Sequence, residues 1–296
     1  MKKKLRVVVL MGGRSSEREI SLLSGKEILA NIDKNAYSVS SVEIPKNGNK
    51  WIDQLLRLKP DLVFIALHGT FGEDGSIQGM LEQLGISYTG SGILASAIGM
   101  DKILFKKIMR IEKIPVPKDI SYIPCFVKPS KEGSSVGASP VFKQNMLKPA
   151  IKLAKKFSDD VLVEEYIKGI ELTCAVIGNE DPVALPVIEI HPLKAKFFDY
   201  KSKYKINGSE EIVPAGISKN IAKKVQELSI KVYKIIGCSG FARVDFILKD
   251  NKYPIVLEIN TIPGLTKMSL VPKAAKGAGI SFSKLIDTII NLAVVK

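Results

Sequence analysis

The first hundred residues alternate between almost entirely apolar stretches and amphipathic ones. Apolar stretches such as 5–11 and 61–67 are typical of strands that are covered on both faces. Ser16-Glu17-Arg18-Glu19 has the spacing of a capping box and predicts that a helix opens there. The pattern predicts strands at 5–11, 39–44 and 61–67, followed by helices that end near 31 and span 51–58 and 78–84. This alternation favours a parallel, doubly wound α/β sheet, whose ligands bind beyond the carboxyl ends of its strands.

Further along the chain the pattern changes to that of an α+β mixture. Helices are expected at 101–112, 144–157, 219–236 and 281–293, and strands at 125–128, 161–166, 170–177, 183–190, 241–248 and 253–260. Residues 191–216 are polar and show no helical or strand period. A loop of that length inside a compact protein predicts a lid or a binding loop.

The composition is that of a packed protein with 296 residues, of which 46% are hydrophobic. This content excludes a disordered chain, and no run of about 18 uncharged apolar residues predicts a membrane span. The lysine-rich start precedes an apolar run that is too short for a signal peptide. The 3 cysteines are widely spaced and predict neither a disulfide framework nor a metal site. A cytoplasmic protein with no membrane partner is therefore expected.

The net charge of +14 raises the question of nucleic-acid binding. The most basic part is residues 101–163, which hold 13 basic and 6 acidic side chains. These lysines follow helical spacing, and no aromatic residues alternate with them as a base-stacking surface requires. A solvated lysine-rich surface is the favoured interpretation, with some lysines left to hold a nucleotide triphosphate. A basic nucleic-acid binder without catalysis remains the alternative.

The most informative segment reads as two strands joined in a hairpin at Asp250-Asn251. Side chains alternate along a strand, so Arg243 and Asp245 share a face, as do Glu258 and Asn260. With a two-residue turn, Arg243 lies opposite Glu258 and Asp245 lies diagonal to it. This oxygen-rich face predicts a Mg²⁺ site that works with substrate phosphates. The alternative is a solvated polar face with an Arg–Glu pair, and the apolar opposite face of the strand argues against it.

A second segment with candidate chemistry is the glycine- and serine-rich loop at 131–137, which follows the strand that ends at Lys128. Small residues let backbone N–H groups approach phosphate oxygens, although such a loop alone is equally a flexible turn. Beside a two-carboxylate hairpin it predicts a phosphate site. Gly90-Ser91-Gly92-Ile93-Leu94-Ala95 matches a dinucleotide-binding pattern but follows only a weak strand, so that interpretation is not favoured.

Several of these segments resemble one known family. His68–Gly79 resembles the first signature of D-alanine–D-alanine ligases, and the segment from Arg243 to Thr266 resembles the second. Gly12–Glu17, Glu132–Gly137 and Ser269–Pro272 match in the same order, so the resemblance covers essentially the whole chain. It implies an ATP-grasp fold with three domains, namely 1–98 for substrate, 99–163 as the central ATP-grasp subdomain, and 164–296 with the metal site and lid.

The resemblance also implies the reaction. ATP phosphorylates the carboxylate of one D-alanine, and the amine of a second attacks the acyl phosphate to give the dipeptide used in peptidoglycan precursor synthesis. For the first D-alanine it implies Glu17 at the ammonium and His68 near the carboxylate. For the second it implies Ser269 and Leu270 at the carboxylate, with Ser134 and Tyr204 joining Glu17 to arrange the attacking amine. Arg243 and the Gly264 N–H are implied at the oxyanion.

On the nucleotide side the resemblance implies that lysines bind the phosphates of ATP and that carboxylates hold the metal. The phosphate ligands are Lys102, Lys128 and, from the lid, Lys203. The adenosine clamp is Glu164-Glu165-Tyr166-Ile167 together with Glu171. Asp245, Glu258 and Asn260 hold two Mg²⁺ ions, for which Mn²⁺ can substitute.

One departure from the family pattern is the connection between Pro117 and Cys125, which lacks the helix that relatives usually insert there. This predicts a more open adenine side. Another ATP-grasp amino-acid ligase would differ at Glu17, His68 and Ser269, and all three match here. The partners expected are ATP, D-alanine and a second copy of the chain in a homodimer, with no nucleic acid.

Overall fold

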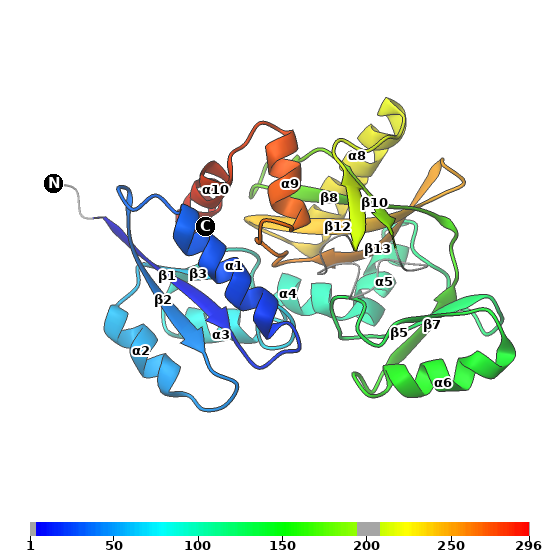
Figure 1. The fold of residues 1–296 in the computed structure, drawn as a ribbon, viewed down its shortest axis with the longest axis horizontal. Coiled ribbons are helices and arrows are strands. Elements are labelled where there is room, and N and C mark those ends of the chain that lie inside the picture. Colours follow the sequence, from blue (N-terminus) through cyan, green and yellow to red (C-terminus); the bar gives the residue numbers. More distant parts are fainter. Residues whose placement is uncertain (1–3, 194–207, 296) are drawn as a thin grey trace.

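The apolar stretches of the first hundred residues form a parallel sheet in a computed structural model that describes residues 4–193 and 208–295. Its order is β2-β1-β3-β4, and each neighbouring pair is parallel. The strands are β1 (Leu5–Gly12), β2 (Tyr37–Ile44), β3 (Leu62–Ile65) and β4 (Ser87–Tyr88), and the connecting helices are α1 (Arg18–Asn31), α2 (Lys50–Leu58) and α3 (Ser76–Gln83). The predicted doubly wound sheet is confirmed (Figure 1).

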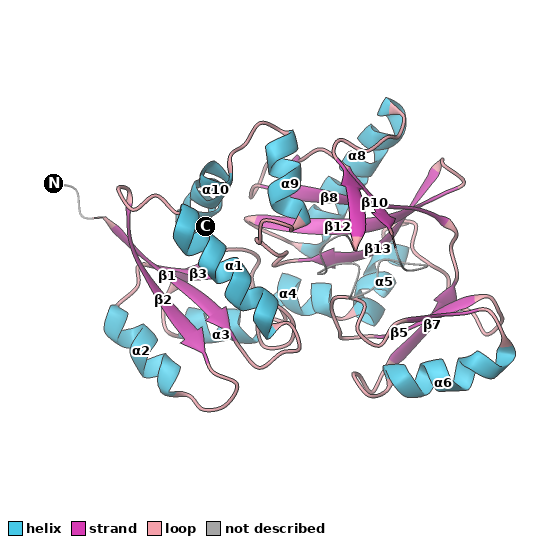
Figure 2. Cartoon of the chain, in the orientation of Figure 1, coloured by secondary structure: helices cyan, strands magenta, loops and turns pink. Residues whose placement is uncertain are grey.

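The central part of the chain forms a small antiparallel sheet in the order β6-β5-β7. It consists of β5 (Cys125–Pro129), β6 (Ser139–Val141) and β7 (Val161–Glu165), and α6 (Gln144–Ala154) packs on it. Two helices, α4 (Ile93–Met100) and α5 (Lys102–Ile111), connect the first sheet to this one. In Figure 2, α6 lies on one side of β5 and β7, away from the first sheet.

The third sheet is antiparallel and has the order β11-β10-β8-β12-β13, with β9 beside β8. Its strands are β8 (Gly169–Ile177), β9 (Val183–Ala184), β10 (Ile188–Pro192), β11 (Ser209–Ile212), β12 (Phe241–Lys249) and β13 (Tyr253–Asn260). The last helices are α8 (Lys219–Ile236), α9 (Leu270–Gly277) and α10 (Phe282–Val294). One face of β12, with Val244 and Phe246, packs with α8 and α5 in an apolar core. The other face carries Arg243 and Asp245.

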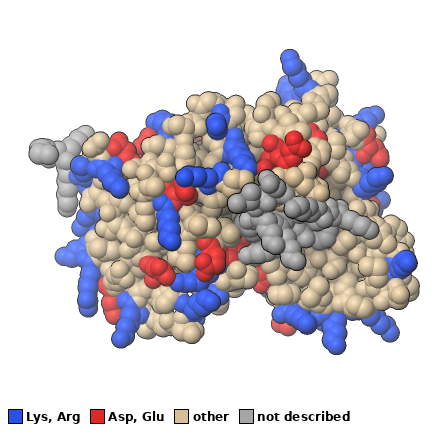
Figure 3. Space-filling view, viewed as in Figure 1, with Lys and Arg blue, Asp and Glu red and all other residues tan. Residues whose placement is uncertain are grey.

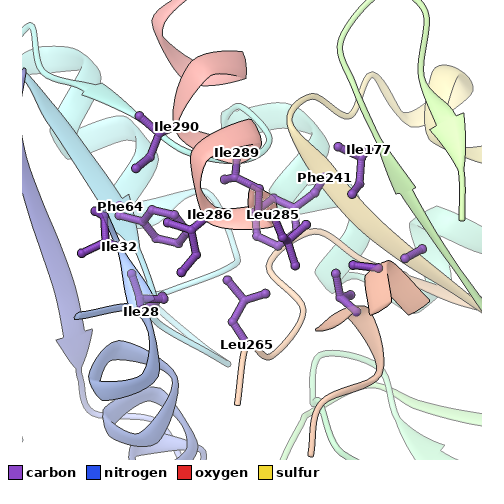
Figure 4. Packing of buried hydrophobic residues seen from close by; sticks show 14 of the residues in the cluster. Ile28, Ile32, Phe64, Ile177, Phe241, Leu265, Leu285, Ile286, Ile289 and Ile290 are labelled. Atoms are coloured by element: carbon purple, nitrogen blue, oxygen red, sulfur yellow. The ribbon is translucent and has the colours of Figure 1, made fainter. Parts of the chain in front are cut away.

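The first and third sheets share one hydrophobic core. Ile28 and Phe64 from the first sheet and its helix α1 belong to the same cluster as Phe241 from β12 and Ile286 from α10. Figure 4 shows α10 residues between these two groups of side chains. Burial of apolar surface contributes about 25 cal/mol per Å² to stability. The shared core therefore holds the two sheets together and fixes the loops at their edges.

Several predicted boundaries were wrong. The helix after β1 begins at Arg18, with Glu17 as its N-cap and no side-chain capping bond, so the predicted capping box at Ser16 does not form. The Ser15 hydroxyl instead accepts the backbone N–H of Glu17. The strand expected at 183–190 is two strands, β9 and β10, separated by Leu185, Pro186 and Val187. Helices α4 and α9 and strands β6 and β11 were not predicted.

The Gly90–Ala95 segment joins the first and third sheets. The Ser239 hydroxyl donates to the Gly90 carbonyl at 3.0 Å, and a Cβ on Gly240 would lie 3.2 Å from the Gly90 Cα. The small residues therefore allow two backbones to approach closely, which is a packing role.

On the face drawn in Figure 3, Lys and Arg side chains are spread around the molecule, and Asp and Glu side chains lie among them. Among the described residues, no single helix is long and apolar enough to cross a membrane, although α9 and α10, bent by 105°, pass that test as a pair.

Candidate active site

Two adjoining cavities contain most of the predicted site residues. A cavity of about 300 Å³ is lined by Glu17, His68, Ser134, Arg243, Asn260, Gly264 and Ser269, and we call it the substrate cavity. A cavity of about 350 Å³ is lined by Lys128, Glu164, Glu165, Tyr166, Ile167, Glu171 and Asp245, and we call it the nucleotide cavity. Of the described residues, Lys102, Glu258 and Leu270 line both. Groups bound in the two cavities would therefore meet at this shared wall.

The hairpin brings the predicted metal ligands to this wall, but the predicted register was wrong. Asp245 pairs directly with Glu258, and Arg243 pairs with Asn260. Two extra residues on β13 cause the shift, one at the turn, where Lys249 pairs with Tyr253, and one at an irregularity between Asp245 and Phe246. The observed register places the two carboxylates on adjacent strands opposite each other, as a shared cation requires.

Asp245 is held in place by its neighbours. Arg243 donates to both carboxylate oxygens of Asp245, at 2.8 and 2.7 Å, in a bidentate pair. The buried Thr173 hydroxyl on β8 also donates to Asp245, at 2.6 Å. Charge-assisted bonds of this kind fix the carboxylate before any ligand arrives.

Lys102 links the shared wall to the glycine- and serine-rich loop. Its ammonium donates to the Glu132 carbonyl at 2.6 Å and lies 3.2 Å from Glu258 Oε2. It begins α5, whose N-terminus is capped by the Asp101 carboxylate accepting from the N–H groups of Ile103 and Leu104. A buried cation therefore lies between Glu258, a predicted metal ligand, and the predicted phosphate loop.

Glu17 and Ser134 meet in the substrate cavity although they lie far apart in the sequence. The Ser134 hydroxyl donates to Glu17 Oε1, and both residues are buried. Ser134 and Ser135 both have left-handed backbones, with φ of 52° and 58°, a conformation that costs about 1–2 kcal/mol for a residue with a side chain. A Cβ on Gly133 would lie 2.6 Å from Glu17 Oε2, so only glycine leaves room for this contact.

His68 is buried and neutral. Its Nδ1 lies 3.0 Å from the Ile262 carbonyl and its Nε2 lies 3.0 Å from the Ser24 hydroxyl. Because a carbonyl can only accept, Nδ1 carries the proton and Nε2 accepts from Ser24. Burial lowers the pKa of His68, while the nearby Glu17 carboxylate opposes this effect. The imidazole is therefore a fixed, neutral part of the cavity wall.

Ser269, a predicted site residue, is the N-cap of α9, a helix that was not predicted. Its hydroxyl accepts the Thr266 N–H at 3.0 Å, and a Cβ on Gly264 would lie 2.8 Å from Ser269 Oγ. Since α9 starts at Leu270, the positive end of the helix lies at the cavity wall. This arrangement favours a carboxylate there.

The nucleotide cavity contains a buried charge pair and an aromatic contact. Glu164 Oε2 lies 2.9 Å from Lys128 Nζ, and the Glu165 carboxylate accepts the Lys118 N–H at 2.9 Å. The Tyr166 and Phe142 rings meet edge to face with centroids 4.8 Å apart. Through the hydrogen bond from Lys118, the backbone of the short 117–125 connection is held at the edge of β7.

Glu73 is a candidate residue that sequence reasoning missed. It lines the substrate cavity, and its Oε2 is buried with no hydrogen-bond partner among the described residues. Burial, followed by the charge of Glu17, raises the pKa of Glu73 to about 8. Its place inside the His68–Gly79 signature was the available signal, but its burial could not be read from the sequence.

Two predicted residues, Lys203 and Tyr204, lie outside the described residues, and the predicted lid at 191–211 is described only at its ends. Among the described residues no group of three or more His, Cys, Asp or Glu side chains could hold a metal ion. Asp245 and Glu258 with the Asn260 amide form a mixed set, and oxygen donors of this kind suit Mg²⁺ when phosphates supply further ligands.

Comparisons with known proteins agree with this arrangement. The model described as D-ala D-ala ligase C-terminus matches residues 103–291, and the D-ala D-ala ligase N-terminus matches 6–60 and 52–91. The D-alanine–D-alanine ligase of Carboxydothermus hydrogenoformans is 43% identical, with 97% of this chain and 98% of the relative covered. D-alanine–D-alanine ligase B of Clostridium perfringens is 40% identical over 99% of both chains.

Two solved structures share the fold over nearly the whole chain. The D-alanine–D-alanine ligase of Bacillus anthracis complexed with ATP has a TM-score of 0.84 and 35% identity, with 98% of each chain covered. The VanG D-Ala:D-Ser ligase of Enterococcus faecalis also has a TM-score of 0.84, with 33% identity, 98% of this chain and 100% of that one covered. The fold is that of an ATP-grasp, ATP-dependent ligase. The chain belongs to the D-alanine–D-alanine ligase family, as its signatures predicted.

Proposed function

We propose that this chain joins two D-alanines through a D-alanyl phosphate, with ATP as the phosphate donor. The wall shared by the two cavities at Lys102 and Glu258 carries this proposal. A terminal phosphate on the nucleotide side would lie next to a carboxylate on the substrate side. Its transfer activates that carboxylate, and the amine of a second D-alanine then displaces phosphate to leave dipeptide, ADP and phosphate. The dipeptide would serve peptidoglycan precursor synthesis in the cytoplasm.

The first D-alanine would bind between the buried acids and His68. Glu17 would accept from its ammonium, and the nearby Glu73 adds a second acidic group. His68, neutral and bonded at both ring nitrogens, would set the position of the substrate carboxylate. A substrate ammonium in this buried cavity would add a charge-assisted hydrogen bond to Glu17.

The second D-alanine would bind at the start of α9. Its carboxylate would face Ser269 and the Leu270 N–H, at the positive end of the helix. Ser134 and Glu17, with Tyr204, would orient the attacking amine. Arg243 and the Gly264 N–H would stabilise the oxyanion that forms on the activated carbonyl.

The nucleotide cavity would bind ATP. Lys102 and Lys128, with Lys203, would contact its phosphates, while Glu164–Ile167 and Glu171 would enclose the adenosine. Asp245, Glu258 and Asn260 would hold two Mg²⁺ ions, or Mn²⁺, which supply positive charge to the phosphoryl group in transfer. The direct opposition of Asp245 and Glu258 supports this assignment.

We also propose how the chain divides into domains and how it assembles. The three sheets of the described residues fall close to the segments 1–98, 99–163 and 164–296, although β7 ends at Glu165, just beyond the second boundary. The shared core of the first and third sheets joins the segments 1–98 and 164–296. A homodimer is proposed as the assembly.

A substrate panel tests the proposed function. Purified protein is given ATP, Mg²⁺ and one amino acid at a time, and both phosphate and ligated product are measured. We expect D-alanine to give one dipeptide for each phosphate, with L-alanine inactive. Phosphate release that is equal with and without a D-amino acid would contradict the proposal, and a preference for D-serine as the second substrate would correct the acceptor.

A further inference from the structure

A buried lysine lies behind the nucleotide cavity without lining it. Lys106 on α5 is 1% exposed, and it is absent from the described residues that line either cavity. Its ammonium lies 2.5 Å from Glu164 Oε1 and 2.6 Å from Asp119 Oδ1. Lysine is almost never fully buried unless it is paired, so its partners explain why it is tolerated but not what it does.

The partner Glu164 connects Lys106 to the nucleotide cavity. One carboxylate oxygen of Glu164 contacts Lys106, and the other lies 2.9 Å from Lys128 Nζ. Glu164 is itself 2% exposed, so solvent does not compete for its oxygens. With both oxygens occupied, the carboxylate has one orientation, and that orientation determines where the Lys128 ammonium lies.

The charges of Lys106, Glu164 and Lys128 together leave Lys128 able to attract an anion. Paired with Lys128 alone, Glu164 would cancel its charge at close range. Because Lys106 shares the carboxylate, the three side chains carry one net positive charge, and Asp119 is balanced separately by Arg110 at 2.7 Å. Inside a protein this surplus is screened less than it would be in water.

We propose that Lys106 is a positioning residue for the nucleotide phosphates: through Glu164 it fixes Lys128 and keeps the positive charge of Lys128 available to ATP. The inference rests on the proposed assignment of Lys128 to the phosphates. It is nevertheless tested by nucleotide binding alone, so absence of dipeptide synthesis would reject the proposed function without deciding the role of Lys106.

The test compares ATP with adenosine, which lacks the phosphates. Dissociation constants for both are measured by calorimetry on the full chain carrying Lys106→Met. The matched control is Lys107→Met, which removes the same charge from the exposed side of the same helix. We expect Lys106→Met to weaken ATP about tenfold and to leave adenosine within about twofold, with no change in the control. Equal weakening of both ligands would show a purely structural role and overturn the proposal, as would unchanged ATP binding.

A second variant covers the case in which Lys106→Met does not fold, because removal of one partner leaves a buried charge unpaired. Lys106→Met combined with Glu164→Gln removes one charge of each sign, leaves Lys128 with the same net charge around it, and keeps an amide oxygen that can accept from Lys128. We expect the ratio of adenosine to ATP dissociation constants in this double variant to stay within about threefold of wild type. A ratio reduced about tenfold in the double variant would overturn the proposal.

Discussion

The two cavities share a wall but balance their buried charges in opposite ways. Beside the nucleotide cavity, the acid Glu164 lies between two lysines, Lys106 and Lys128, so these three side chains carry one net positive charge before any ligand binds. In the substrate cavity, Glu17 and Glu73 are both buried, and the charge of one raises the pKa of the other. The comparison teaches that a buried acid is balanced in two ways: Glu164 is matched by two lysines, which leaves a charge for the phosphates of ATP, whereas the raised pKa of Glu73 keeps a proton on it, which leaves Glu17 as the acid for the ammonium of an amino acid.

The largest expected effect is at the shared wall. Asp245→Asn keeps the shape of the side chain but removes one of the two carboxylate charges that would hold metal and phosphate together. We expect turnover with Mg²⁺ to fall by about a hundredfold or more, because charge stabilisation of the transferring phosphoryl group is lost. Initial rates of phosphate release at saturating ATP measure this.

The matched control for that change is Asp250→Asn in the turn of the same hairpin. Asp250 is exposed and has φ of 52°, a left-handed conformation that asparagine also adopts readily. Its rate should equal that of the wild type. A wild-type rate for Asp245→Asn at ordinary Mg²⁺ concentrations would remove Asp245 from the proposed metal site.

The next effect separates the cavities. Glu17→Gln removes a negative charge from the substrate cavity only, so we expect KM for D-alanine to rise about tenfold or more while KM for ATP stays unchanged. Steady-state kinetics with each substrate varied in turn distinguish the two. Glu19→Gln, at an exposed position in the first turn of α1, is the control. Equal increases in both KM values would mean that Glu17 does not distinguish the cavities.

A smaller effect concerns stability and pH. The pKa of Glu73 is raised from 4.5 to about 8 in the folded protein, so the folded state binds the proton more tightly than the unfolded state. The stability from this group is complete below pH 4.5 and is lost as pH rises through about 8. Glu73→Gln lacks this loss, so its Tm should exceed that of the wild type by roughly 5 °C at pH 8 and by little near pH 4.5.

Thermal unfolding across this pH range measures the difference. Glu227→Gln on α8, at an exposed side chain, is the control and should follow the wild-type curve. A constant difference in Tm between Glu73→Gln and wild type at all pH values would mean that Glu73 titrates normally. Adding Glu17→Gln should move the transition to lower pH, since the Glu17 charge raises the pKa of Glu73.

The smallest expected effect is on product choice. Near neutral pH the attacking amine is mostly an ammonium, whereas D-lactate offers an uncharged hydroxyl. A tyrosine hydroxyl can both donate and accept, so Tyr204→Phe should slow dipeptide formation and raise the share of the D-lactate ester, most clearly near pH 6. Competition between D-alanine and D-lactate gives the ratio of products. A ratio that does not change at any pH would assign selectivity to other residues.

Long apolar stretches and signatures made much of the fold predictable. The strands at 5–11 and 61–67 needed no tertiary information, because burial on both faces gives an uninterrupted apolar pattern. Helix α9 was missed because it is short and contains Pro272 in its first turn, where a helix tolerates proline but the sequence shows no clear period.

The geometry of the site was less predictable, because it depends on contacts between distant residues. The hairpin register shifted by two residues because a turn and an irregularity each added one, which no local pattern in β13 reveals. The contact between Glu17 and Ser134 spans 117 positions. The raised pKa of Glu73 depends on burial by the folded chain, so it had no counterpart in the sequence.

The most direct test is the fate of the oxygen atoms of D-alanine. If its carboxylate is phosphorylated and the second amine then attacks the carbonyl carbon, one carboxylate oxygen leaves with the phosphate. D-alanine labelled with ¹⁸O in its carboxylate is incubated with unlabelled ATP and water, and the released phosphate is examined by mass spectrometry. We expect one ¹⁸O in each phosphate, matched by an equal amount of dipeptide. Phosphate without the label would show that water attacks ATP directly, and it would contradict the transfer across the shared wall of the two cavities.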